Sequence, residues 1–368
     1  MTQKKPVTIP TKALTSIDAL VAHGLVTEDA AGALRPVEEN FSIRLTPEIF
    51  RQMRSYEAYD PVHAQYVPST DELDVAPEEL SDPIGDETYQ QVKGITHRYP
   101  DRVLLKPTHT CQVYCRFCFR REKVGQADEA LNQDELSAAL DYIARTPEVW
   151  EVILSGGDPL ILSDRRLGMI LDRLEQMEHV EVIRFHTRIP VVDPQRITGD
   201  LVATLKRRRA AVYVVIHINH PNELTDAVKT GLARLVDAGI PVLSQTVLLK
   251  GVNNDAGILT RLMRGLVGAR VKPYYLHHLD KAKGTGHFRC SVEEGQKLMA
   301  ALRGRLSGLC QPTYVLDIPG GHGKVPIGPS YLTPDGEESY IVRDYQGGSH
   351  DYEDGCDQEV PISGHPGS

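Results

Sequence analysis

Three cysteines lie within eight residues of the chain, Cys111, Cys115 and Cys118, in the segment HTCQVYCRFCFRR. Thiolates at this CxxxCxxC spacing can bind three irons of a [4Fe–4S] cluster and leave the fourth iron without a protein ligand. That iron could then bind and reduce an outside molecule. A structural zinc site with His109 as a fourth ligand is one alternative, and unrelated free cysteines are another.

A second candidate site is the turn Ser155-Gly156-Gly157-Asp158, which follows a β-rich run. Two glycines allow a backbone to approach a ligand closely, and the acid can accept a hydrogen bond from an ammonium group. A tight turn between a strand and a helix explains the same residues without any ligand.

A third candidate is the glycine-rich segment DIPGGHGKVP, which contains Lys324. It lacks the Walker spacing, and no Ser or Thr follows the lysine, so a nucleotide P-loop is not predicted. A lysine on an accessible loop can form a Schiff base with an aldehyde, which makes pyridoxal phosphate a candidate cofactor. The alternative is a surface turn with a solvated lysine.

The elements that must position these motifs alternate between short β-rich runs and amphipathic stretches from about residue 103 to 317. The predicted strands are 103–108, 149–157, 180–188, 211–219, 241–250 and 271–279, with a seventh at 313–318. The clearest predicted helices are 132–146, 163–177, 194–208, 225–239 and 255–269. The pattern predicts an α/β fold, a partial (βα)6 barrel, with the cysteines at the C-terminal mouth where barrels place their chemistry.

The regions on either side of the barrel have different patterns. Residues 1–95 predict a helical N-terminal appendage, and within it the Pro- and acid-rich stretch 66–87 predicts an exposed connector. Residues 96–324 form the predicted barrel. Residues 325–368 predict a C-terminal extension with a flexible end.

Composition restricts the classes of partner. The 368 residues carry a formal net charge of −9, with no block of five like charges, which argues against nucleic acid or an anionic membrane as the main partner. No long apolar run or signal-peptide pattern occurs, so we expect a cytoplasmic protein that acts on small molecules. The scattered Cys290, Cys310 and Cys356 do not suggest a disulfide scaffold.

The motifs together resemble the lysine 2,3-aminomutase family of radical S-adenosylmethionine enzymes, from about residue 40 to 350. The resemblance rests on HRYPDR, the cysteine segment, SGGDPL, HTRIPVVDPQRIT, HINHPNELT, QTVLLKGVNND, KPYYLHHLD and DIPGGHGK in this order. It implies a [4Fe–4S] cluster on the three cysteines, S-adenosyl-L-methionine on the open iron and pyridoxal 5'-phosphate on Lys324. It also implies an electron donor such as flavodoxin or ferredoxin.

The resemblance further implies roles for individual residues. Arg120 would bind the substrate carboxylate, and Asp280 and Asp317 would bind its distal ammonium. In the alternative interpretation the two acids bind no substrate: Asp280 forms an ion pair with Lys281 or Lys283, and Asp317 caps the glycine turn. The implied cofactor-binding residues are Arg98, Tyr99, Arg102, Ser155, Gly156, Gly157, Asp158, His217, Gln245 and His277, the last standing where the lysine enzymes carry tyrosine.

The implied activity is an isomerisation that moves the α-amino group of L-lysine to C3 and gives β-lysine. The same chemistry could supply (R)-β-lysine for elongation factor P, or act on another cationic amino acid such as arginine. A radical enzyme without pyridoxal phosphate and a non-enzymatic metal-binding protein are alternatives from other classes. Only Cys356 lies in the tail where larger relatives carry a zinc-binding cysteine cluster, so no structural zinc is predicted, and a homo-oligomer is a candidate assembly.

Overall fold

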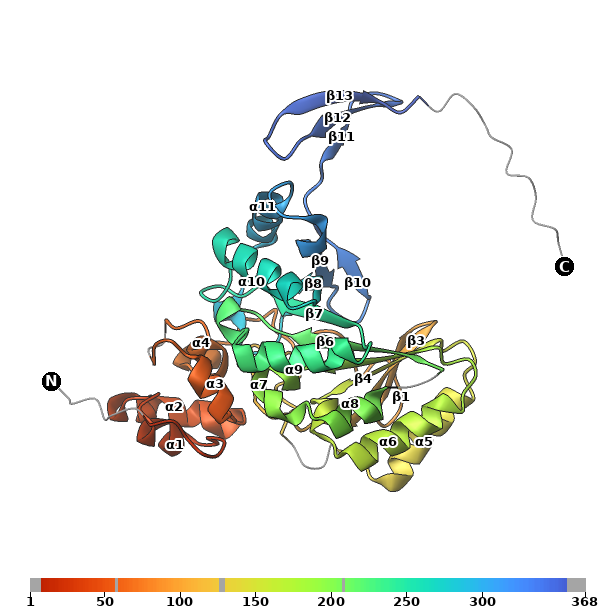
Figure 1. Ribbon diagram of the computed structural model, residues 1–368. Helices are drawn as coiled ribbons and strands as arrows, with labels where there is room; N and C mark the ends of the chain where they lie inside the picture. Colours follow the sequence, from red (N-terminus) through yellow and green to blue (C-terminus); the bar gives the residue numbers. More distant parts are fainter. Residues whose placement is uncertain (1–7, 57–58, 126–129, 207–208, 356–368) are drawn as a thin grey trace.

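A single ten-stranded sheet organises the chain, with its strands in sequence order from β1 to β10 (Figure 1). The computed structural model describes residues 8–56, 59–125, 130–206 and 209–355. Seven consecutive strands are parallel: β3 (Arg102–Thr108), β4 (Glu151–Gly156), β5 (Val182–Thr187), β6 (Ala211–His217), β7 (Val242–Val247), β8 (Lys272–His277) and β9 (Thr313–Asp317). The predicted strands and their parallel α/β arrangement are confirmed.

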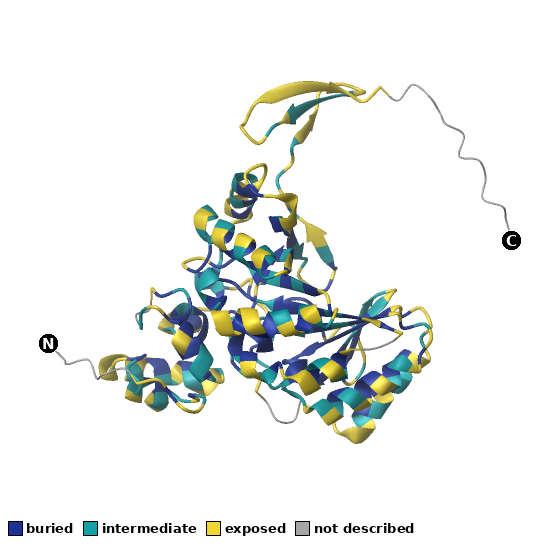
Figure 2. Cartoon of the chain, viewed as in Figure 1, coloured by how far each residue is buried: buried dark blue, intermediate teal, exposed yellow. Residues whose placement is uncertain are grey.

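Helices pack on the outside of the parallel strands, as the amphipathic pattern predicts. They are α5 (Gln133–Ala144), α6 (Asp164–Glu175), α8 (Gly199–Leu205), α9 (Asp226–Asp237), α10 (Ala256–Gly268) and α11 (Val292–Leu302). Each begins behind a side-chain N-cap, such as Ser163 before α6. Figure 2 shows buried residues concentrated in the strands and in the helix faces that cover them. All six residues of β4 are buried, as expected for a strand covered on both faces.

The helix predicted over 194–208 is shorter than expected. A 3-10 turn, η4 (Pro194–Arg196), comes first, and α8 starts only at Gly199 because Thr198 caps it by accepting from the Leu201 amide. The remaining short helices are η3 (Pro159–Ile161), α7 (Ile189–Val192), η5 (Pro221–Glu223), η6 (Gly286–Phe288) and η7 (Gly308–Cys310).

Antiparallel strands lie at both ends of the sheet. β1 (Gln90–Val92) and β2 (Ile95–Tyr99) precede β3, and β10 (Lys324–Pro326) pairs with β9. The register of the last pair places Lys324 directly opposite Asp317. Within the described residues β1 and β10 do not pair with each other, so the sheet is an open, partial barrel.

The N-terminal segment packs on one end of this barrel (Figure 1). It contains α1 (Ile17–Ala22), α2 (Glu28–Asn40), α3 (Pro47–Gln52), α4 (His63–Tyr66) and η1 (Thr70–Leu73). Gln52 donates to the Val191 carbonyl at 2.7 Å, and Thr46 donates to the Val192 carbonyl at 2.8 Å, so this end is joined to the loop after β5.

The prediction of an exposed connector over 66–87 is only partly right, because residues such as 73–75 are exposed but the segment is anchored by buried acids. Glu72, Glu79 and Asp86 in this segment are at most 5% exposed. Each accepts hydrogen bonds from one or two arginines of the barrel loops, for example Arg116 on Glu72 and Arg289 on Glu79. Local sequence does not show these partners, because they lie 34 to 210 residues away.

The C-terminal extension forms a separate three-stranded antiparallel sheet (Figure 1). Its strands are β11 (Leu332–Pro334), β12 (Ser339–Arg343) and β13 (Ser349–Glu353), and β11 and β13 are exposed throughout. Cys356 and the predicted flexible end lie outside the described residues. Among the residues described, no helix has both the length and the apolar composition that a membrane crossing requires.

Candidate active site

One cavity of about 800 Å³, which extends from the first residues of several parallel strands to the loops at their C-terminal ends, brings the predicted site residues together. Its lining includes the three cysteines, the SGGD turn and Lys324. It also includes Arg98, Tyr99, Arg102, Arg120, His217, Gln245, His277, Asp280 and Asp317. Residues that are more than 200 positions apart in the chain therefore face one space.

The cysteines lie on the loop after β3. All three are unpaired and partly accessible, and burial raises the pKa of each thiol, that of Cys115 to about 11. A buried thiolate is costly unless positive charge compensates it, which iron in a cluster would provide. The three sulfurs and their electropositive surroundings, with Arg120 and Arg188 nearby, therefore fit such a cluster. No three His, Cys, Asp or Glu side chains within the described ranges could hold a single metal ion.

The glycine turn packs against the backbone of the cysteine loop. The Gly157 amide donates to the Thr108 carbonyl at 2.7 Å, and a Cβ at position 157 would lie 2.3 Å from the Thr110 oxygen. Gly156 adopts φ 101°, a conformation that favours glycine. The tight-turn interpretation therefore accounts for both glycines, and the same close approach positions the turn beside the cysteines.

Asp158 is a buried clamp between β4 and β5. Its carboxylate accepts from the Thr187 hydroxyl at 2.6 Å and from the Arg188 amide at 2.6 Å, with further bonds from the Leu160 and Ile189 amides. Burial raises the pKa of this carboxyl, and the four donors oppose that rise. Any ligand ammonium group that bonds to the Asp158 carboxylate would therefore be a fifth donor, in addition to the four donors from the protein.

Arg120 is held by an acid that sequence reasoning missed. Its Nε donates to Asp86 Oδ2 at 2.7 Å and its Nη1 donates to Ser155 Oγ at 3.3 Å. Lys106 Nζ lies 3.6 Å from the same Asp86 oxygen, and these cations hold the pKa of the carboxyl well below its usual range despite burial. The guanidinium is thus fixed on the cavity wall in an orientation set by the N-terminal segment.

The lining of the cavity also carries two acids, Asp280 and Asp317. Asp317 pairs with Lys324 Nζ, and His277 Nδ1 lies 3.7 Å from its Oδ2. Although burial opposes it, these contacts lower the pKa of Asp317 to about 2. Asp280 forms no hydrogen bond or ion pair through its carboxylate within the described residues, and burial together with Asp317 raises its pKa to about 7.

The alternative pairings of these acids are not found in the described residues. Lys283 lies 3.6 Å from Glu122 rather than beside Asp280. Asp317 pairs with Lys324 and does not cap the glycine turn, whose Ile318 amide bonds to the Gly323 carbonyl. The two acids therefore line the cavity together, with Lys324 paired to Asp317, Arg98 Nη1 4.0 Å from the other Asp317 oxygen, and no direct partner on the Asp280 carboxylate in the described residues.

The β2–β3 hairpin supplies the residues predicted to surround the phosphate and ring of pyridoxal phosphate. The Lys324 amide donates to the Tyr99 hydroxyl at 2.8 Å, and the Arg102 guanidinium lies over the Tyr99 ring at 4.0 Å. Arg98 donates to the Ile84 carbonyl, and its buried Nε has no hydrogen-bond partner in the described structure. Two arginines and a tyrosine beside the lysine suit a phosphorylated aldehyde.

Histidines line the space between the cysteines and the acids. His217 at the end of β6 is opposite Gln245 on β7, and His277 ends β8. The buried Nε2 atoms of His186, His217 and His277 have no partner in the part of the chain described, and burial lowers the pKa of each ring. Neutral rings with unused nitrogens can bond to a bound cofactor or substrate. His186, like Asp86, was not found from sequence, since a single histidine in a strand carries no spacing signal.

Comparison with known proteins identifies the family. Residues 105–260 match the Radical SAM superfamily, and residues 299–362 match the family described as Lysine-2,3-aminomutase. The chain is 41% identical over 323 residues to the L-lysine 2,3-aminomutase of Clostridium subterminale, covering 88% of this chain and 77% of that one. It belongs to the lysine 2,3-aminomutase family.

Other relatives in the lysine 2,3-aminomutase family differ in substrate. The L-lysine 2,3-aminomutase of Escherichia coli is 37% identical, with 82% of this chain and 87% of that one covered. The glutamate 2,3-aminomutase of Clostridioides difficile is 36% identical, with 91% and 79% covered. The chain is therefore a radical S-adenosylmethionine aminomutase, an isomerase, and its family implies a [4Fe–4S] cluster and S-adenosylmethionine. The predicted family and partial-barrel fold are confirmed.

Proposed function

We propose that the enzyme is a pyridoxal phosphate-dependent aminomutase that moves the α-amino group of free L-lysine to C3 and gives β-lysine. The observation that carries this proposal is the distribution of charge in the cavity. Arg120 and the pair Asp280 and Asp317 line the same cavity. A substrate with a carboxylate at one end and an ammonium at the other complements the arginine and the two acids.

The acid pair favours a cationic side chain over an anionic one. Two carboxylates in a half-enclosed space repel each other, and the raised pKa of Asp280 expresses that repulsion together with burial. A bound ammonium would relieve the repulsion, whereas the carboxylate of glutamate would add to it. The relative from Clostridioides difficile named for glutamate is therefore a poorer guide to the substrate of this chain than those named for lysine.

Lys324 is the proposed attachment point of pyridoxal phosphate. When bound, the cluster and S-adenosylmethionine supply a radical that abstracts hydrogen, and pyridoxal phosphate supplies an aldehyde to which the migrating nitrogen is attached. Arg98, Tyr99 and Arg102 would hold the phosphate and ring. Lys324 Nζ pairs with Asp317 in this structure. If Nζ instead binds the aldehyde of the cofactor, Asp317 can pair with the side-chain ammonium of the substrate.

The N-terminal segment completes the enclosure. Asp86 orients Arg120, and the Leu80 amide donates to the Lys281 carbonyl at 2.8 Å, next to Asp280. Both ends of the proposed substrate site therefore contact this segment. We propose that it also limits the access of water and oxygen to a radical intermediate. Electrons would come from a flavodoxin or ferredoxin, and the cytoplasmic location stays a prediction.

The decisive experiment incubates the reconstituted protein anaerobically with S-adenosylmethionine, pyridoxal phosphate, a strong reductant and one amino acid at a time. L-Lysine, L-arginine and L-glutamate are compared, and chiral chromatography separates the α and β products. β-Lysine from lysine alone is the expected result, and the hand of the product would distinguish a free β-lysine role from supply to elongation factor P. A product from arginine or glutamate, with none from lysine, would overturn the substrate proposal.

Dependence on pyridoxal phosphate has its own test. Wild type mixed with the cofactor should develop an absorbance band near the visible edge, and Lys324→Ala should lack it. Lys283→Ala is the matched control, because that lysine lies 3.6 Å from Glu122 and does not line the cavity. A band that persists in Lys324→Ala, or lysine turnover without the cofactor, would favour the radical enzyme without pyridoxal phosphate.

A further inference from the structure

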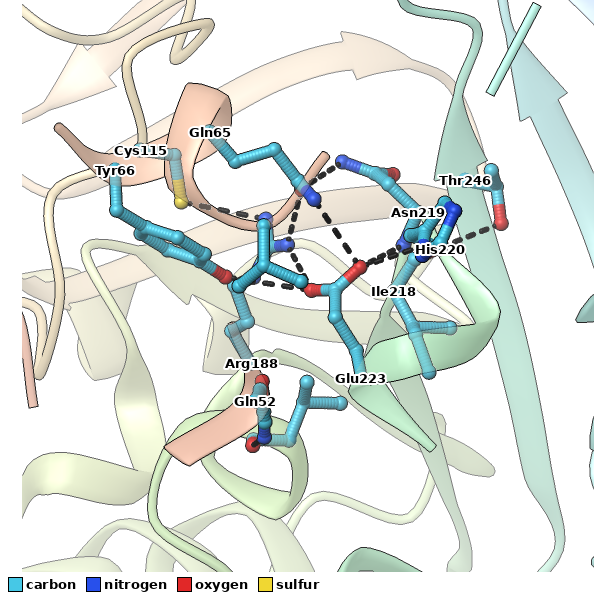
Figure 3. A network of polar contacts seen from close by, with 12 residues as sticks. Gln52, Gln65, Tyr66, Cys115, Arg188, Ile218, Asn219, His220, Glu223 and Thr246 are labelled. Carbon is cyan, nitrogen blue, oxygen red and sulfur yellow. Dashed lines mark hydrogen bonds and ion pairs between the residues drawn. The ribbon is translucent and has the colours of Figure 1, made fainter. Parts of the chain in front are cut away.

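Arg188, which the sequence analysis did not single out, contacts one of the cluster cysteines. It follows β5 and precedes α7. Its Nη1 donates to Cys115 Sγ at 3.3 Å, as Figure 3 shows. The side chain is 6% exposed, so the guanidinium approaches the sulfur with little intervening water.

A buried network holds the guanidinium in this position. Its Nη2 donates to Glu223 Oε1 at 2.7 Å and to Gln65 Oε1 at 2.9 Å. Glu223, whose side chain is fully buried, also accepts from the amides of Asn219 and His220 at 2.9 and 2.7 Å (Figure 3). The network thus joins the loops after β3, β5 and β6 to α4 of the N-terminal segment.

Two aromatic rings also lie close to the Arg188 guanidinium. Its carbon lies 5.1 Å from the centre of the Tyr66 ring and 5.3 Å from that of Phe117. Rings at these distances favour the cation and exclude water. Arginine stays charged in proteins, so a permanent positive charge lies beside the sulfur of Cys115, compensated in part by Glu223.

We propose that Arg188 is a positioning residue that hydrogen-bonds the cluster ligand Cys115 and makes the [4Fe–4S] cluster easier to reduce. Reduction adds one electron to the cluster and increases the negative charge on its sulfurs. A hydrogen bond to a ligand sulfur and a nearby cation both stabilise the reduced form. Glu223 holds the arginine in place and moderates its charge. The proposal depends on the cluster that family membership implies and not on the identity of the substrate.

The test is an anaerobic redox titration of the cluster, followed by electron paramagnetic resonance of the reduced form. It uses the full-length, cluster-loaded protein without S-adenosylmethionine, pyridoxal phosphate or amino acid. In Arg188→Met the ratio of reduced to oxidised cluster at a fixed solution potential should fall about tenfold, which is about 59 mV for one electron. Iron content and circular dichroism show whether each variant is loaded and folded.

Two further variants separate this role from general damage. Glu223→Gln removes the compensating charge and keeps an oxygen acceptor, so the cluster should become easier to reduce, the opposite direction to Arg188→Met. Arg184→Met is the matched control, because Arg184 lies on β5, four residues before Arg188, and its side chain is 13% exposed and pairs with Glu151 at 2.9 Å. Its cluster should titrate like that of wild type.

Several outcomes would overturn the proposal. An unchanged potential in Arg188→Met is one, and an equal shift in Arg184→Met is another. A shift in the same direction for Arg188→Met and Glu223→Gln would point to loosened packing instead. If Arg188→Met does not retain iron, the test rests on Glu223→Gln alone. A cluster reduction potential in Glu223→Gln that is not higher than that of wild type then refutes the proposal. Since no amino acid is present, failure here is independent of whether the enzyme forms β-lysine.

Discussion

Asp280 should be unfavourable for stability and necessary for activity, and Asp280→Asn separates the two effects. The carboxyl lies in the cavity without a partner in the described structure, and burial with Asp317 nearby raises its pKa to about 7 from 3.8. The folded protein thus binds this proton more tightly than the unfolded chain does. The contribution of Asp280 to stability is fully present below about pH 4 and is lost as pH rises through 7.

The size of the effect follows from the shift. Each unit of pKa corresponds to about 1.4 kcal/mol, so about three units set a ceiling of about 4 kcal/mol at pH 8. Water can enter the cavity and screen the charge, which reduces the expected destabilisation to about 2 kcal/mol. Asparagine has the same shape and no charge. The variant should therefore be more stable than wild type by about 2 kcal/mol at pH 8, by less than about 1 kcal/mol at pH 5, and equally stable below about pH 4.

The assay is urea-induced unfolding of the cluster-loaded protein, without lysine, at pH 5 and pH 8. Asp141→Asn is the control, because Asp141 is a surface acid on α5 paired with Arg173, and it should show no such pH-dependent gain. The same Asp280→Asn protein should lose at least about thirtyfold in kcat/KM for lysine, since about 2 kcal/mol or more of charge pairing is removed. A variant that is less stable than wild type at pH 8, or that keeps full activity, would refute the reasoning.

Three further predictions concern the same cavity and its supports. The kcat/KM for lysine should fall about tenfold between pH 8 and pH 6, because Asp280 with a pKa of about 7 becomes protonated; a flat profile would contradict this. Glu72→Gln should lower the free energy of unfolding by about 3–5 kcal/mol, since it leaves Arg116 and Arg121 buried without a counter-charge. Thermal unfolding of the variant and of wild type measures this loss, and a loss below about 1 kcal/mol would contradict the prediction. Gly157→Ala should bind less iron per chain, because its Cβ would lie 2.3 Å from a backbone oxygen of the cysteine loop, whereas Gly168→Ala should bind as much as wild type.

The barrel was predictable because its signals are local. Apolar β-rich runs and capped amphipathic helices alternate along the chain, and every predicted parallel strand is present. The predicted bounds of a helix are wrong where a polar side chain inside it caps the backbone. Thr198 does this, and α8 therefore starts within the helix predicted over 194–208. The prediction of an exposed connector over 66–87 was only partly right for a related reason. A segment rich in acids and proline resembles a solvated linker unless its arginine partners are known, and those partners lie on distant loops.

The sequence by itself determined the cysteine triad, the glycine turn, the lysine loop and the acid pair, because each is a set of reactive residue types at a readable spacing or in a motif. Only the tertiary structure decided how these groups are held. Asp86 orients Arg120, Asp158 clamps two strands, and Arg188 reaches Cys115 through a network spanning four segments. A buried charge is stable only beside its partner, and such partners come together through the order and register of the strands, which no single segment of sequence contains.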